Sequence, residues 1–274
     1  MYSGTTLRTK SGRIMGAHQK IDRVARKSLL SIVPKDTKFP KISEILHFEG
    51  KNGPDGIKSK SPSVDEPWHY IDPTKPDDRE IFRLVNDHSH NLATALAEDN
   101  TERAAFEAAW LAHAIVDGLT PAHHFPLADK IEELWGHPHD ERITIREKNL
   151  ISGESRRDTI SKNWEYWGAK GIFTTHFMFE LGFASTISAL RFSDLSPSLS
   201  DQKRAETEGI ESIFEEAIRD IHRLGMYEIY YKKGWTRKVA SQSREVLAPV
   251  IINVVTLSWY AAVKEAERMK GDKK

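Results

Sequence analysis

The chain has 274 residues, of which 39% are apolar and 29% charged, the composition of an ordinary globular protein with a sizeable core. Basic and acidic residues number 40 each, so the formal net charge is zero and the composition gives no support for a broadly basic nucleic-acid binder. The absence of cysteine excludes disulfides and thiolate zinc sites and is typical of a reducing compartment.

Apolar residues recur at helical spacing along most of the chain. Residues 1–17 are predicted to be a polar arm, and residues 33–76 a long loop with seven prolines, broken only by a short turn near residues 42–47. Thr101 is the predicted N-cap of the third helix, which Pro121 prevents from continuing. Residues 136–158 are predicted to be a polar surface excursion. The predicted helices are 18–32, 77–98, 101–118, 127–135, 159–167, 171–190, 202–224 and 241–269.

The fold class follows from these elements. The sequence contains no internal repeat and no run of residues typical of strands, and no linker divides it. We therefore expect an all-α, single-domain helical bundle over residues 18–270, with long connecting loops and a metal cluster at its centre.

The first chemical motif is His113-Ala-Ile-Val-Asp117, followed by Pro121 and His123. Residues four apart lie on one helix face, so His113 and Asp117 point the same way, on a face that is otherwise apolar. A carboxylate buried there needs a cationic partner, and a metal ion is one such partner. The alternative is a hydrogen-bonded core histidine and an ordinary aspartate, but the negative end of the helix dipole disfavours an acid at this position.

The second motif, His176-Phe-Met-Phe-Glu180, has the same spacing on another apolar face. Taken alone, it is better explained by a buried histidine–glutamate hydrogen bond within one helix. Two such pairs together with His123 favour a metal site, because facing helices of a bundle commonly build metal sites in this way.

Further candidates lie in the proline-rich loop and on the first helix. Asp55 precedes His69 by fourteen residues, and Trp68 and Tyr70 flank His69. Pro54-Asp55-Gly56 also suits an ordinary turn, and the aromatic side chains also suit packing. His18 opens the first helix, where an exposed histidine is the simpler interpretation.

The ordered set of motifs resembles the bacterial zinc-dependent phospholipases C, whose fold is shared with the fungal and plant single-strand-specific zinc nucleases. The matching elements are His18 on the first helix, His69-Tyr-Ile-Asp-Pro, the His113/Asp117/His123 pattern, the His176/Glu180 pair and Asp55 at the spacing of the loop aspartate. The last helix, with Leu257-Ser-Trp-Tyr, is similar as well.

The resemblance implies two or three Zn²⁺ ions. One would be held by Asp55, His69, His113 and Asp117, a second by His123, His176 and Glu180, and a third by His18 and a bridging Asp117. In the family a processed N-terminal Trp completes the third site, and no Trp precedes His18 here. A backbone carbonyl near residues 13–17, or a water, is expected to replace it.

The expected function is zinc-dependent hydrolysis of a phosphodiester, most simply a phospholipid head-group ester. Asp55 is the expected catalytic carboxylate, by family analogy, and Tyr70 and Trp68 are the candidate substrate-binding side chains. A single-strand nuclease or nucleotidase of the same fold is one alternative. A metal-binding helical module without activity is another.

The expected location and partners follow from what the sequence lacks. The first 20 residues contain no apolar stretch of the kind found in secretory signals, so we expect a cytoplasmic protein, although the resemblance would suggest secretion. No segment approaches the run of about 20 apolar residues that a membrane-spanning helix needs, so we expect no membrane span. No protein partner is implied.

Overall fold

Helices make up 74% of the chain in the computed structural model, and its described residues form no strands. The structure describes residues 1, 16–57, 69–138, 141, 144–193 and 195–272. The all-α prediction is confirmed. The major helices are α1 (Ala17–Ile32), α4 (Glu80–Ala97), α5 (Thr101–Gly118), α6 (Leu127–Trp135), α8 (Arg156–Trp167), α9 (Ile172–Ser188), α10 (Leu199–Thr207), α11 (Gly209–Arg223), α12 (Met226–Lys233) and α14 (Ala248–Asp272).

Short helical segments fill the connections. The loop after α1 carries α2 (Ile42–Ile45), the 3-10 turns η1 (Leu46–Phe48) and η2 (Gly50–Asn52), and α3 (Pro54–Ile57). The 3-10 turn η3 (Pro121–His124) follows α5, and α7 (Ile145–Asn149) precedes α8. The last helix is preceded by α13 (Arg237–Gln242) and a π-helical turn, η5 (Ser243–Leu247).

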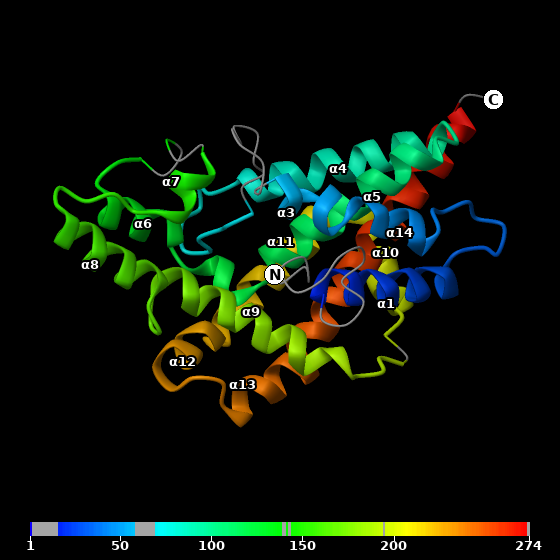
Figure 1. The fold of residues 1–274 in the computed structure, drawn as a ribbon. Helices are drawn as coiled ribbons and strands as arrows, with labels where there is room; N and C mark the ends of the chain where they lie inside the picture. The colour runs from blue at the N-terminus through cyan, green and yellow to red at the C-terminus, as the bar shows by residue number, and fades with distance from the viewer. Residues whose placement is uncertain (2–15, 58–68, 139–140, 142–143, 194, 273–274) are drawn as a thin grey trace.

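Helix α5 is the centre of the bundle. It packs against α4, α14 and α1, and Figure 1 shows α4 and α5 running side by side. Its many alanines are fully or almost fully buried, and such small side chains let neighbouring helices approach closely. Trp259 of α14 is fully buried, and its indole N–H donates to the carbonyl of Ala108 at 3.0 Å. Burial of a large apolar side chain stabilises the fold by roughly 1.5–3 kcal/mol.

The continuous helix from Arg237 to Asp272 is long and apolar enough to cross a membrane by length and composition. In the structure 72% of its most apolar window is buried inside the protein, against α1, α4, α5, α10 and α11. This placement is that of a core helix. The absence of a membrane span stays a prediction.

A second apolar cluster lies beside the bundle. It consists of Leu127, Ile131, Leu134, Ile151 and Tyr166, from α6, α8 and the connection between them. Tyr70 and Phe173 pack against it, so this cluster supports both the loop that contains His69 and the start of α9.

Several predicted helix limits are wrong. The N-cap of α5 is Asn100, whose side-chain oxygen accepts from the Arg103 N–H at 3.1 Å, and Thr101 is already helical. The predicted helix 202–224 is two helices, because Gly209, the first residue of α11, adopts φ +79°. Helix α8 starts at Arg156, where Ser155 caps it, and α7 forms inside the predicted polar excursion.

Candidate metal centre

Asp117 lies at the meeting point of three imidazoles. One carboxylate oxygen, Oδ2, is 3.0 Å from His69 Nδ1 and 3.3 Å from His113 Nε2, and the other, Oδ1, is 3.3 Å from His18 Nε2. The three histidines come from the proline-rich loop, from α5 and from α1. All four side chains are at most 2% exposed. The bundle therefore brings together residues almost a hundred positions apart around one buried carboxylate.

Glu180 is the centre of a second group. Its Oε1 atom lies 2.9 Å from His176 Nε2, one turn earlier on α9, and 3.0 Å from His123 Nε2 on η3. The predicted convergence of His123 on the His176–Glu180 pair is thus present. Helix α5 ends at Gly118, and η3, with Pro121 in its first turn, reverses the chain so that His123 faces α9.

Backbone hydrogen bonds fasten the loop to η3. The Ile71 N–H donates to the His123 carbonyl at 3.1 Å, and His123 Nδ1 lies 3.0 Å from the His69 carbonyl. Since a carbonyl only accepts, His123 carries its proton on Nδ1 and presents Nε2 to Glu180. The same contacts fix the position of His69.

The backbone of Met1 lies between the two groups. Its amino group contacts Asp117 and is 3.3 Å from Glu180 Oε1, and its carbonyl is 2.8 Å from His18 Nε2. Figure 1 shows the N-terminus in the middle of the fold, and its contacts with His18 and Glu180 place it beside α1 and α9. The carbonyl beside His18 therefore belongs to Met1, not to residues 16–17; residues 13–15 lie outside the described residues.

Charges in this centre are strongly coupled. Burial alone would raise the pKa values of Asp117 and Glu180, but the Met1 amino group and the surrounding histidines hold both well below the usual range. Burial would lower the pKa of His113, but the carboxylates of Asp117 and Glu49 raise it to about 10. Burial dominates at His123 and lowers its pKa to about 4. Ionised carboxylates thus persist in a buried site, where they require positive charge.

Two sets of three side chains could each hold a metal ion. They are His18, His113 and Asp117, and His123, His176 and Glu180, with ligand atoms within 4.8 Å of one another in each set. His113 Nε2 points into the first set and has no hydrogen-bond partner among the described residues, so it is open to an ion, which would displace the proton held there in the metal-free protein. Nitrogen and oxygen ligands in this number suit a divalent transition metal.

The remaining candidates lie around these sets. Asp55, on the four-residue helix α3, is 3.7 Å from His113 Nε2 and is the most exposed candidate ligand, at 20%. Tyr70 stacks on the ring of His123 with centroids 4.6 Å apart. Trp68 lies outside the described residues.

Two buried acids near the centre were not predicted. Glu49, in the bend between η1 and η2, has Oε2 at 3.3 Å from His113 Nδ1. Asp22, on α1, is fully buried; burial and the nearby Glu49 carboxylate raise its pKa well above the usual range. Asp22 follows His18 by four residues, the same spacing as in the His113/Asp117 and His176/Glu180 pairs. Sequence spacing could therefore have identified Asp22. Glu49 sits in an irregular segment, where spacing gives no such signal.

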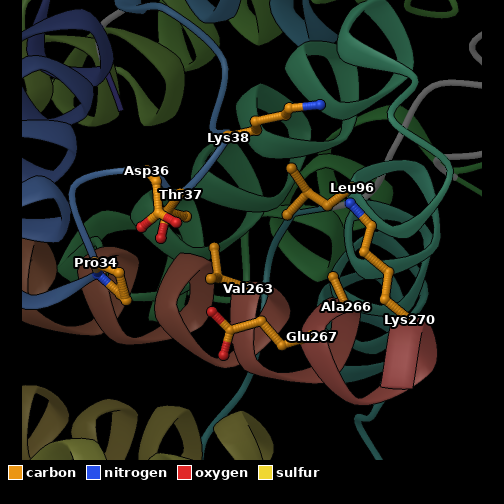
Figure 2. A pocket seen from close by; sticks show the side chains of 9 residues that line it. All are labelled: Pro34, Asp36, Thr37, Lys38, Leu96, Val263, Ala266, Glu267 and Lys270. Carbon is orange, nitrogen blue, oxygen red and sulfur yellow. The ribbon is translucent and has the colours of Figure 1, made fainter. Parts of the chain in front are cut away.

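One surface hollow lies away from the metal centre. It has a volume of about 320 Å³ and lies between the loop after α1 and the helices α4 and α14, as Figure 2 shows. Its lining includes Lys38, Glu267 and Lys270 but no histidine and none of the candidate ligands. This hollow therefore has no part in the metal centre.

Comparison of the sequence with known protein families and with curated proteins gives no match.

Proposed function

We propose that this protein is a zinc-dependent phosphodiester hydrolase, similar to the zinc-dependent phospholipases C. The observation that carries the proposal is the joining of two buried imidazole–carboxylate sets around Asp117 and Glu180. A hydrogen bond within one helix does not account for either pair, because each carboxylate also contacts histidines from other segments of the chain. Such convergence is costly to fold without cations and is typical of a site for more than one ion.

Zinc is the proposed metal because the side-chain ligands are five imidazoles and three carboxylates, with no thiolate. The ligands are those expected from the resemblance: His18, Asp55, His69, His113, Asp117, His123, His176 and Glu180. Zinc bound there would supply polarised phosphoryl oxygens and a water of lowered pKa. Two or three zinc ions would carry more positive charge than the negative charge of the three carboxylates. An anionic phosphodiester is the substrate that matches this excess of positive charge.

Side chains of the protein would take the remaining roles in the reaction. Asp55 is the most exposed candidate ligand, at 20%, and its carboxylate would accept a proton from an attacking water. Asp117 and Glu180, almost excluded from solvent, keep the imidazole nitrogens oriented inward. Tyr70 covers His123 and, with ring centroids 5.6 Å apart, approaches His176, so it forms one wall of the site.

Exposed apolar side chains favour a lipid substrate over a nucleotide. Ile160 and Trp164 on α8 are 71% and 74% exposed and lie one turn apart on one helix face. Trp167 is the last residue of this helix. Its ring packs against the ring of Phe173 at the start of α9, with the ring centroids 4.7 Å apart. Tryptophan and isoleucine on an outer helix face suit the interface of a lipid bilayer.

The test is hydrolysis of a soluble chromogenic phosphodiester by protein supplied with zinc, compared with protein held in excess chelator. Zinc-dependent turnover is the expected result. Phosphatidylcholine vesicles and single-stranded DNA are then compared as substrates. Faster cleavage of DNA would replace the lipid with a nucleic acid, and zinc binding without hydrolysis of any of the three would favour a metal-binding module.

A further inference from the structure

Two buried carboxylates, Asp22 and Glu49, remain without a role in the proposed function. Asp22 is fully buried and Glu49 is 5% exposed. Among the described residues, both oxygens of Asp22 and Oε1 of Glu49 lack a hydrogen-bond partner. Burial of acids without partners destabilises a fold, so their presence beside the metal centre calls for a function.

The ring of His113 connects Glu49 to the centre. Its Nε2 atom faces Asp117 at 3.3 Å, while Nδ1, on the other side of the ring, is 3.3 Å from Glu49 Oε2. A carboxylate beside Nδ1 favours a proton there, and the proton donates to Glu49. The lone pair of Nε2 is then directed to the metal centre.

The ring of His18 has the same orientation. It stacks on His113 with centroids 3.9 Å apart and an interplanar angle of 11°, and both rings present Nε2 to Asp117. Two nearly parallel rings that share this direction place their Nδ1 atoms on the same side. His18 Nδ1 is buried without a partner among the described residues, and its Nε2 also lies 2.8 Å from the Met1 carbonyl. Asp22 follows His18 by one helical turn on α1, but neither of its oxygens has a hydrogen-bond partner in the same part of the chain.

We propose that Glu49 is a positioning residue that holds His113 as an Nε2 ligand. It contacts neither the substrate nor the ions, and it accepts from Nδ1 of His113. Asp22 takes no part in the proposal, because no contact joins it to His18 among the described residues. This inference rests on the proposed metal centre. It adds that metal affinity is set partly by an acid outside the ligand set.

The test compares Glu49→Gln with Glu107→Gln. Glu107 is a matched control, since it is fully buried on α5 and lies 2.6 Å from His88 Nδ1, outside the ligand set. Zinc affinity is measured by competition with a chromogenic chelator, and histidine tautomers by long-range ¹H–¹⁵N correlation. We expect about 10- to 100-fold weaker binding of at least one ion in Glu49→Gln. The control should bind zinc as the unaltered protein does.

Glu49→Gln also reports which ion is affected. Zinc held by His123, His176 and Glu180 should keep its affinity, because Glu49 contacts none of these side chains in the structure's described part. Unchanged affinity and an unchanged His113 tautomer in the folded variant, confirmed by circular dichroism, would overturn the inference. Failure of the unaltered protein to bind zinc would instead overturn the proposed function, so the two failures are distinguishable. If Glu49→Gln does not fold, the His113 tautomer of the unaltered, zinc-loaded protein decides the matter, because a proton on Nε2 rather than on Nδ1 would overturn the inference.

Discussion

Replacement of Asp117 by asparagine removes one negative charge with almost no change in shape. In the structure the carboxylate contacts imidazoles of His18, His69 and His113 at 3.0–3.3 Å, whereas Glu180 contacts those of His123 and His176. Asp117 also contacts the Met1 amino group, which lies between the two sets. Asp117→Asn should therefore loosen at least two ions, and Glu180→Gln only one.

The size of the effect follows from the number of ions touched. A loss of about 100-fold in affinity per ion corresponds to about 2.7 kcal/mol. Asp117→Asn would then destabilise zinc binding by roughly 5 kcal/mol in total, about twice the effect of Glu180→Gln. The assay is equilibrium dialysis against graded chelator, followed by metal analysis. Equal zinc loss in the two variants would refute the bridging position of Asp117.

Four further outcomes are expected. His18→Ala should remove at most one zinc and lower turnover, while the other ions remain. Gly118→Ala should destabilise the fold by about 1–3 kcal/mol, because the new Cβ would lie 2.5 Å from Phe214 Cζ; urea unfolding measures this. Burial lowers the pKa of His124 to about 4, so between pH 6.5 and 4 only the unfolded form gains this proton. His124 should account for a loss of about 3 kcal/mol of stability in the metal-free protein across that window, and His124→Gln should lose correspondingly less than the unaltered protein. Trp164→Ser should weaken sedimentation with phosphatidylcholine vesicles but leave hydrolysis of a soluble phosphodiester unchanged.

Each outcome has a control and a contradicting result. Full zinc content and full turnover in His18→Ala would make that histidine a purely structural residue. Gly271→Ala, which meets nothing within 4 Å, should keep its stability. His90→Gln, at an exposed histidine, should keep the pH dependence of the unaltered protein, and identical profiles for His124→Gln would contradict the buried neutral state. Leu199→Ser, at an 82% exposed leucine on α10, should sediment normally with vesicles, and equal loss in both variants would argue against a role for α8.

Much of the fold could be predicted because helix periodicity is a local property. The limits of α6 agree with the prediction, and those of α1, α4 and α9 agree within three residues. The division between α10 and α11 was missed because it depends on Gly209 at positive φ, and a single glycine inside an amphipathic pattern does not by itself indicate a break. Helix α12 was missed altogether.

The candidate site was predictable to the extent that its residues are spaced by helical turns. His113 with Asp117, and His176 with Glu180, follow from the four-residue period, and the structure brings both pairs to one place. Glu49 could not be found in this way, because an irregular segment delivers it from a distant part of the chain. The contacts of Met1 are likewise tertiary, since sixteen residues separate it from His18 in sequence but its carbonyl lies 2.8 Å away.

The central claim is that these side chains hold more than one zinc ion. Metal analysis of protein purified without chelator tests it most directly, with zinc counted per chain by elemental mass spectrometry. The structure and the resemblance together predict two or three zinc ions per chain. One ion, or none even after zinc is supplied in excess, would contradict the metal centre built around Asp117 and Glu180.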